Sequence, residues 1–185
     1  MKDLKRIESL SDLLEILPRC SGTDFVKIAD DMQIPAEELA EYAFWSDERY
    51  TRNCIDRRDH YELILLCWEE AQETPVHCHA GEECWVYTLQ GNLKEERFDE
   101  GENGGLIHLQ TEQMKAGELS YMNDNMGFHS LKKVGQGRAM TLHLYMNPID
   151  RCRIYDQDKQ CFEVKEMSYD SFRGKPTEEF LALAE

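Results

Sequence analysis

The stretch PVHCHAGEECWVYTLQGN, residues 75–92, contains two histidines, two cysteines and two glutamates. His77 and His79 are two residues apart, so on a β-strand both side chains project from one face and Cys78 projects from the other. Two imidazoles on the inward face of a barrel could bind one metal ion. An isolated His-x-His pair is weak evidence, because two hydrogen-bonded histidines on one strand are common. Further ligands are needed.

The chain around this stretch has the pattern of many short strands. From residue 52 onward, segments rich in β-branched and aromatic residues alternate with Asn, Asp and Gly, which is typical of a β-sandwich or barrel. The stretch DEGENGG, residues 99–105, is expected to form an exposed turn. The expected strands lie within residues 61–70, 84–91, 106–112, 117–123, 138–147 and 152–156.

The first quarter of the chain has a helical pattern instead. Apolar residues at three- and four-residue spacing over 4–16 predict an amphipathic helix, and a second helix is expected at about 23–32. Pro35 with acidic residues behind it suits the first turn of a third. We therefore expect a mainly β structural domain in which helices within 1–47 pack on a β-barrel formed by 48–185.

Composition and charge exclude several classes of partner. The 185 residues carry a formal net charge of −16, so no basic surface is expected for nucleic acid or anionic membranes. No apolar run approaches the roughly 20 residues that span a bilayer, and acidic residues interrupt the N-terminal apolar pattern, unlike a signal peptide. Seven irregularly spaced cysteines therefore indicate reduced thiols in a cytoplasmic protein, which we expect to be a monomer.

A third histidine extends the metal pattern. His129 follows a strand that begins at Gly117, and the His-x-His strand is followed by a strand that closes at Gly91. This order of elements resembles the two motifs of the cupin proteins. In that layout His77, His79 and His129 are metal ligands.

The carboxylate that often completes a cupin site is missing. Its usual position, seven residues before the closing glycine, is occupied by Cys84. Glu83 could bind the metal only if a β-bulge shifted the register by one residue. Two other histidines, His60 and His108, lie in polar, turn-like surroundings and are expected at the surface.

Several blocks in order resemble the cysteine dioxygenase family of cupins, over roughly residues 48–175. The resemblance implies a cupin (jelly-roll) barrel and an Fe(II) ion held by the three histidines without a carboxylate. It also implies that L-cysteine and dioxygen react to give cysteine sulfinic acid. The matching blocks are YTRN (50–53), CW (67–68), HCH (77–79), Cys84 with LQGNLKE (89–95), GFH (127–129), LHLYMNPIDRC (142–152), Met167 and SFRG (171–174).

The resemblance also assigns residues around the iron. Arg52 would bind the substrate carboxylate, supported by the hydroxyl of Tyr50, because a guanidinium can donate two parallel hydrogen bonds to a carboxylate. Thr141, His143 and Tyr145 alternate along one strand and would form a relay that does not bind the metal itself.

Cys84 would be joined to Tyr145 by a thioether bond in such a family member. The stretch 146–148, Met-Asn-Pro, stands where the family often has Ser-Pro-Pro with a cis peptide; we expect a trans peptide here and a different pocket wall. The resemblance places Cys152, Trp68 and Met167 near the pocket. The other thiols are expected to be small buried hydrophobic residues: Cys20, Cys54, Cys67, Cys78 and Cys161.

Three alternatives stay open. The substrate could be 3-mercaptopropionate or another small thiol, although relatives specific for that compound typically have glutamine in place of Arg52. The chain could instead be a zinc protein without catalysis, because thiolate and imidazole suit tetrahedral zinc; its ligands would be His77, His79, Cys84 and His129. It could also be a cupin that only binds a small ligand.

Overall fold

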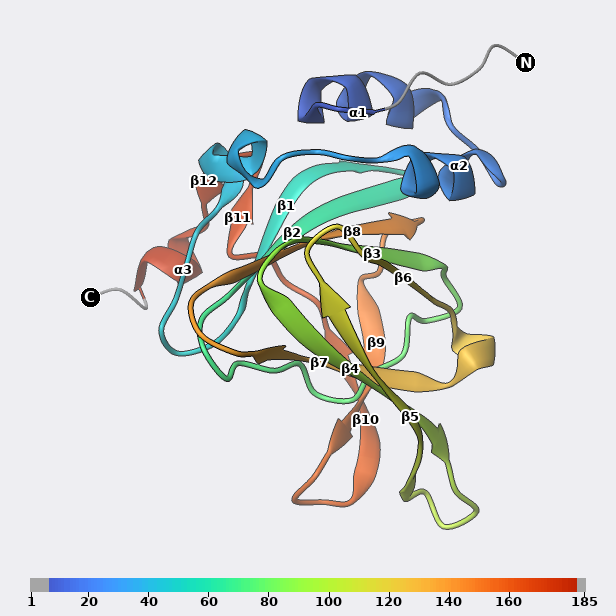
Figure 1. Cartoon of the computed structure of the whole chain (residues 1–185). Coiled ribbons are helices and arrows are strands. Elements are labelled where there is room, and N and C mark those ends of the chain that lie inside the picture. Colours follow the sequence, from blue (N-terminus) through green and yellow to red (C-terminus); the bar gives the residue numbers. More distant parts are fainter. Residues whose placement is uncertain (1–6, 183–185) are drawn as a thin grey trace.

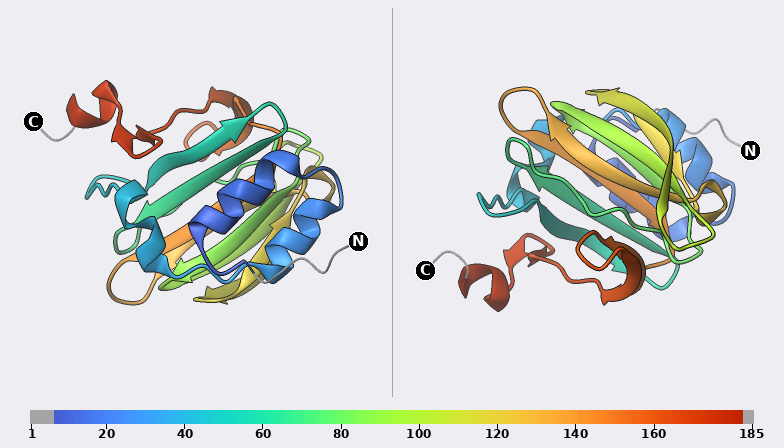
Figure 2. Two further views of the ribbon diagram at one scale, coloured as in Figure 1. Left: turned by 90° about the horizontal axis from the view of Figure 1, so that it is seen from above. Right: turned by 90° about the horizontal axis from the view of Figure 1, so that it is seen from below.

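The computed structural model describes residues 7–182, in which helices cover a β-barrel (Figure 1). Viewed from above, the N-terminal helices lie across one face of the largest sheet (Figure 2). None of the helices in the described part of the chain is long and apolar enough to cross a membrane. The α-helices are α1 (Leu10–Ile16), α2 (Asp24–Asp31) and α3 (Glu178–Ala182), and the 3-10 helices are η1 (Leu17–Arg19), η2 (Ala36–Tyr42) and η3 (Asp124–Met126).

The β-strands account for most of the remaining chain and confirm the expected mainly β class. They are β1 (Thr51–Arg58), β2 (Tyr61–Trp68), β3 (Cys84–Gln90), β4 (Asn92–Glu100), β5 (Leu106–Lys115), β6 (Leu119–Met122), β7 (Phe128–Val134), β8 (Ala139–Met146), β9 (Arg151–Asp156), β10 (Cys161–Glu166), β11 (Ser171–Phe172) and β12 (Lys175–Pro176). The large sheet has the order β12-β11-β1-β2-β8-β3-β6, and the smaller ones have the orders β5-β4-β7 and β10-β9.

An irregular segment joins the two smaller sheets. His77 forms isolated antiparallel bridges with His129 of β7 on one side and Ile154 of β9 on the other, and Glu73 forms another with Lys132. The two sheets therefore continue one another and close the barrel against the large sheet. The expectation of a regular strand at the His-x-His pair is wrong in detail. The segment is extended, but it forms single bridges to two sheets and no continuous strand pairing.

Strand β2 shows why the large sheet is covered on both faces. All eight of its residues are buried. Tyr61 and Leu63 pack in the core under the helices with Phe25, whereas Ile64 and Leu66 belong to the core inside the barrel. The alternation follows from the two-residue period of a strand, and the helices bury a face that water would otherwise contact.

The first helix begins later than predicted. Ser9 is its N-cap, and the Ser9 hydroxyl accepts a hydrogen bond of 3.1 Å from the Asp12 amide. Just before it, Ile7 pairs with Met32 in a parallel bridge, so the chain is extended there. Leu4, which was part of the predicted helix, lies outside the described residues.

Two surface predictions need correction. Cys161 is exposed on β10, whereas the other unassigned thiols are buried as expected; it lies in a two-stranded hairpin that extends away from the barrel (Figure 1). His108 is exposed as predicted, but it lies within strand β5 and not in a turn. The predicted turn between β4 and β5 is present and is closed by a 2.8 Å hydrogen bond from Gly101 N to Gly105 O.

Candidate metal centre and pocket

Three histidines converge inside the barrel. His77 and His129 exchange backbone hydrogen bonds of 2.9 and 3.0 Å, and His79 follows two residues after His77. The three residues each offer a ring nitrogen, and these nitrogens all lie within 4.8 Å of one another. Gly127 has a φ of +87°, and a β-carbon there would clash with the Phe98 carbonyl oxygen, so only glycine fits at the turn that leads into β7.

The outer nitrogens of two rings are held by protein oxygens. His77 Nδ1 lies 2.9 Å from the Pro75 carbonyl oxygen and His129 Nδ1 lies 2.6 Å from Glu95 Oε1, which leaves Nε2 of each ring for a metal. His79 Nδ1 is buried and has no hydrogen-bond partner within residues 7–182. An unpaired buried polar atom costs about 1–3 kcal/mol, so this ring in particular fits a site that a metal completes.

Desolvation keeps the imidazoles of His77 and His79 neutral. Desolvation, followed by the neighbouring His129, lowers the pKa of His77 to about 3 and that of His79 well below its ordinary value. Neutral imidazole is the form that binds metals. Within the described residues, neither Glu83 nor Cys84 joins the group of three histidines. The register shift that would bring in Glu83 and the four-ligand zinc set are therefore not formed.

Glu95 is a site residue that the sequence analysis missed. It is 1% exposed on β4; in addition to its contact with His129, its Oε2 accepts hydrogen bonds from Ser120 Oγ (2.8 Å) and Arg97 Nη2 (3.1 Å). Burial alone would raise the pKa of Glu95, but its hydrogen bonds to His129 and Ser120 and the charge of Arg97 lower it to about 2. An ionised carboxylate on the outer nitrogen orients His129 and makes it a stronger ligand. Its only sequence signal is the alternation with buried Leu93.

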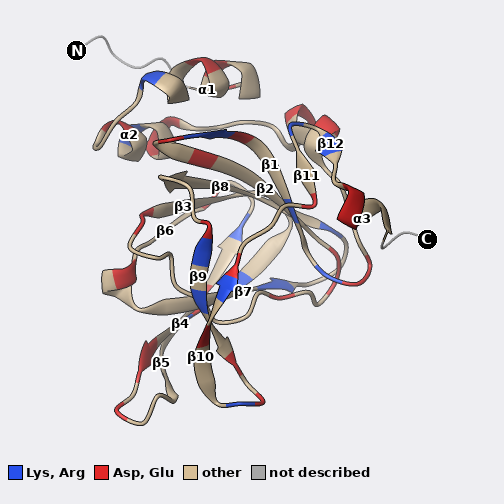
Figure 3. Cartoon of the chain, turned by 180° about the vertical axis from the view of Figure 1, so that it is seen from behind, with Lys and Arg blue, Asp and Glu red and all other residues tan. Residues whose placement is uncertain are grey.

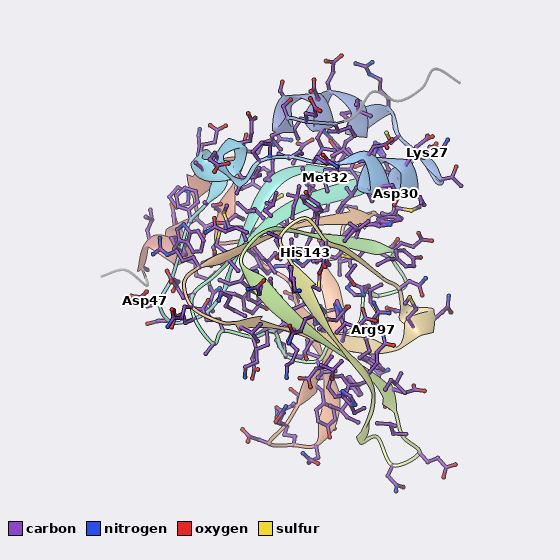
Figure 4. All side chains as sticks on the ribbon, viewed as in Figure 1. Lys27, Asp30, Met32, Asp47, Arg97 and His143 are labelled. Carbon is purple, nitrogen blue, oxygen red and sulfur yellow. The ribbon has the colours of Figure 1, made fainter. Side chains whose placement is uncertain are left out.

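The predicted relay on β8 is assembled. Trp68 Nε1 donates to Thr141 Oγ1 (3.0 Å), which lies 2.8 Å from His143 Nε2, while Tyr145 Oη lies 3.4 Å from His143 Nδ1. Figure 4 shows His143 inside the barrel, below the large sheet. Burial, followed by the charge of Arg52, lowers the pKa of His143 well below its ordinary value, so the ring has one N–H. The arrangement that uses every donor directs the Thr141 hydroxyl to Nε2 and the Nδ1 proton to Tyr145.

Cys84 and Tyr145 are cross-strand partners in the pairing of β3 with β8. Both are buried, and burial raises the pKa of both groups above their ordinary values. The strand pairing places the thiol and the phenol side by side. The predicted pair is therefore adjacent, with both groups protonated.

Arg52 is held at the mouth of the site by the segment after β10. Its backbone N–H donates to Asp170 Oδ2 (2.8 Å), and its Nε donates to the Ser168 carbonyl (3.1 Å). Arg49 fixes the same Asp170 carboxylate with hydrogen bonds of 3.0 and 2.6 Å. These contacts leave the terminal guanidinium nitrogens of Arg52 available to a carboxylate.

Tyr50 contributes through its ring. It stacks on Trp68 with the centroids 4.9 Å apart, and no hydrogen bond joins its hydroxyl to Arg52 in the described chain. The expected support through the hydroxyl is therefore not seen. Trp68 itself lies fully buried behind Tyr50, whereas Met167 and Cys152 line the pocket.

A cavity of about 360 Å³ connects these groups. Its lining includes His77, His143, Tyr145 and Arg52, so a ligand carboxylate at the arginine would be close to the histidine cluster. The volume suits a small organic molecule. Figure 3 shows acidic residues on many of the helices, strands and turns. In a chain of net charge −16, Arg52 supplies local positive charge for an anionic ligand.

The turn after β8 does not line the substrate cavity: Asn147 and Pro148 line a separate hollow with Asp150. Within the described residues no peptide bond is cis, as expected for this stretch, and Asn147 has a φ of +66°. Its side-chain amide donates to Glu82 Oε2 (2.8 Å), and its backbone N–H donates to the His60 carbonyl (3.3 Å). Asn tolerates this left-handed conformation better than most residues.

The chain is similar to known proteins over most of its length. The family described as Cysteine dioxygenase type I matches residues 5–158. Cysteine dioxygenase type 1 from Rattus norvegicus is 32% identical over 166 residues, covering 84% of this chain and 82% of that protein. The Homo sapiens protein is 31% identical over 159 residues (80% of each chain), and the Danio rerio protein is 27% identical over 194 residues (99% and 96%).

Among solved structures, an RmlC-like cupin protein from Desulfovibrio desulfuricans aligns with 63% of this chain and 100% of its own at 19% identity, with a TM-score of 0.44. The family match, which spans the helices and most of the barrel, confirms the expected cupin fold and the expected family. The three-histidine cluster fits a cupin metal site, and family membership supports thiol dioxygenase chemistry on a small thiol. The chain belongs to the cysteine dioxygenase type I family.

Proposed function

We propose that the protein is an iron(II)-dependent dioxygenase that oxidises L-cysteine to cysteine sulfinic acid. Both atoms of one dioxygen molecule add to the sulfur, so that RSH + O2 gives RSO2H. The observation that carries the proposal is the cluster of three histidines, which meets the cavity of Arg52 at His77. The seven cysteines are free, which supports the cytoplasm as the compartment.

His77, His79 and His129 would hold the metal. Three imidazoles add no negative charge to the ion, and among residues 7–182 no carboxylate belongs to the cluster. Bound ferrous iron would supply Lewis acidity toward the substrate thiol and electrons for the activation of dioxygen. Glu95 stabilises the orientation of His129 from outside the cluster.

The remaining residues bind and orient the substrate. Arg52 donates hydrogen bonds to the substrate carboxylate at the cavity mouth. This contact fixes the position of the substrate sulfur relative to the histidines. Tyr145 lines the cavity, and burial keeps its phenol protonated. Tyr145 therefore offers a proton beside the reacting groups.

Metal analysis combined with a panel of thiols tests the proposal. Protein from unsupplemented cells is analysed for metals, reconstituted with Fe(II), and supplied with L-cysteine, 3-mercaptopropionate or cysteamine while oxygen uptake and products are measured. We expect iron-dependent uptake of one O2 per cysteine sulfinate formed, with cysteine as the best substrate. Tightly bound zinc with no oxygen uptake after reconstitution would contradict it, as would a preference for 3-mercaptopropionate.

The role of Arg52 has its own test. Arg52→Gln should lower kcat/KM for L-cysteine by roughly tenfold to a hundredfold, the equivalent of a lost charge-assisted hydrogen bond, but should change little for cysteamine, which lacks a carboxylate. Arg151→Gln is the matched control, because Arg151 is exposed and pairs with exposed Glu166. Unchanged activity of Arg52→Gln with cysteine would show that the carboxylate binds elsewhere.

We also propose that Cys84 and Tyr145 become joined by a thioether bond during turnover. The bond forms between the sulfur and a ring carbon, and the two hydrogen atoms that are lost reduce dioxygen. Intact mass should show a species lighter by two hydrogens, with altered gel mobility, in the wild type and in Cys161→Ser but not in Cys84→Ser. An identical mass before and after turnover would exclude the link.

A further inference from the structure

Two thiols with no part in the proposed reaction share a small cavity beside the three-histidine cluster. Cys78 and Cys152 are 7% and 4% exposed, and both line this cavity together with His79 and Met167. Cys152 also lines the larger substrate cavity. The pair therefore lies between the metal ligands and the substrate pocket, where a small oxidant can arrive.

The backbone brings the two cysteines close together. Cys78 N donates to the Arg153 carbonyl (3.1 Å), and Arg153 N donates to Cys78 Sγ at 3.4 Å. Because Arg153 N is two covalent bonds from the Cys152 α-carbon, Cys78 Sγ lies within about 6 Å of that α-carbon. The α-carbons of disulfide-linked cysteines are usually about 4.4–6.8 Å apart, a spacing that residues diagonally opposite on two paired extended segments can reach. The bridge between His77 and Ile154 holds the two backbones side by side.

The Cys152 side chain must turn before the two sulfurs can meet. Cys78 Sγ also accepts a hydrogen bond from Ala80 N (3.4 Å), so two amides hold the sulfur on the side facing β9. Cys152 Sγ now points to Met167 Sδ at 3.3 Å. Rotation about the Cα–Cβ bond of Cys152 would exchange this weak sulfur contact for the Cys78 sulfur, without moving either backbone out of its bridge.

We propose that Cys78 and Cys152 form a reversible disulfide in the presence of hydrogen peroxide, and that this disulfide lowers the activity of the enzyme. Hydrogen peroxide oxidises the Cys152 thiol, which lines the larger cavity, to a sulfenic acid and water. The Cys78 thiol then attacks that sulfur and releases a second water, so that two RSH and one H2O2 give RSSR and two H2O. A dithiol reductant reverses the reaction.

The disulfide would act on the site from two directions. Cys78 lies between His77 and His79, so a bond to β9 restrains the segment that carries both ligands. The Cys152 side chain would lose its contact with Met167, which would change the wall of the substrate cavity. Turnover is expected to fall in proportion to the linked fraction and to return on reduction.

Peptide mapping of the Fe(II)-loaded, peroxide-treated protein tests the proposal. Free thiols are alkylated before digestion, and a peptide pair linked through Cys78 and Cys152 is expected in the wild type and in the matched control Cys161→Ser, whose sulfur is exposed on β10. Cys78→Ser and Cys152→Ser should lack the linked peptide pair. Peroxide treatment should remove a smaller fraction of the activity of each variant than of the wild type. Mapping in the wild type does not depend on whether these variants fold, nor on which thiol is the substrate.

Either of two results would overturn the inference. One is modification of Cys161 alone, or irreversible sulfinic acid at Cys78 or Cys152 with no linked peptide. The other is a linked protein whose turnover equals that of the reduced protein, which would refute the effect on activity even though the bond forms. Neither result bears on the proposed oxidation of cysteine by the reduced protein.

Discussion

Two buried carboxyl groups in the barrel differ in how their burial is compensated. Glu95 on β4 and Glu62 on β2 are 1% and 0% exposed. Glu95 faces His129 of the metal cluster, whereas Glu62 lies beside β8, directly opposite Tyr145 in the strand pairing. The two have the same chemistry and nearly the same exposure, so any difference between them comes from their neighbours.

Their hydrogen bonds differ in number and in length. Glu95 contacts His129, Ser120 and Arg97, and its pKa falls to about 2. Glu62 Oε1 has no hydrogen-bond partner in the described structure, and Oε2 accepts one long bond of 3.4 Å from the Ile149 amide. Burial raises the pKa of Glu62 above its ordinary value. Hydrogen-bond partners decide whether a buried acid keeps its charge. The charged carboxylate, Glu95, is the one that contacts the three-histidine cluster.

Removing the charge of Glu95 should have the largest effect. We expect Glu95→Gln to weaken metal binding by about tenfold to a hundredfold, because an outer partner of a metal-binding histidine typically contributes that much. Metal competition titrations measure the affinity, and oxygen uptake at saturating iron separates lost metal from lost turnover.

The next residue on β4 supplies the control for that experiment. Glu96 is more exposed and pairs with Lys94 at 2.8 Å, so Glu96→Gln should leave metal affinity unchanged. Equal affinity of Glu95→Gln and wild type would show that the carboxylate charge does not act on His129.

Asp56 extends the comparison to a carboxylate at the rim of the large sheet. Burial alone would raise its pKa, but hydrogen bonds from Tyr61, Arg58 and Arg173 lower it. Asp56→Asn should reduce the free energy of unfolding by about 1–2 kcal/mol, since both arginines are half exposed and screened by water. The exposed residue Asp59 in the following turn provides the control variant Asp59→Asn.

The pH dependence of this effect has a definite sign. A lowered pKa in the folded state means that the contribution of Asp56 is present above the unfolded-state value of about 3.9 and is lost as the pH falls through the folded value. Urea unfolding across the acidic range should therefore show the two proteins converging at low pH. A constant difference at every pH would mean that the substitution acts through packing instead.

The site was predictable from sequence where its signal is local. His77 and His79, like Thr141, His143 and Tyr145, are spaced two residues apart, and the two-residue period of an extended chain is enough to place each set on a common face. The partner of His129 was not predictable in this way, because Glu95 is 34 residues distant and becomes its neighbour only through the pairing of β4 with β7.

Other misses have the same origin in long-range contacts. The segment around His77 is irregular because it bridges two sheets, whereas its own sequence favours an ordinary strand. The late start of the first helix depends on the contact between Ile7 and Met32. Helical periodicity continues through Ile7, so the local pattern cannot reveal that this residue is paired.

Glu62 should give the smallest effect and the opposite sign to Asp56. Glu62→Gln keeps the shape of the side chain but cannot carry an unpaired buried charge, so we expect metal-free protein to gain up to about 1 kcal/mol of stability near neutral pH. Because the folded pKa of Glu62 is raised, the native state binds a proton at a pH where the unfolded chain does not, and wild-type stability rises as the pH falls through that range. In urea unfolding, the advantage of Glu62→Gln should therefore shrink as the pH falls from neutral toward the unfolded-state value of about 4.3. A loss of stability at every pH would show that the 3.6 Å ion pair between Glu62 and Arg57, and not the unpaired oxygen, dominates at this position.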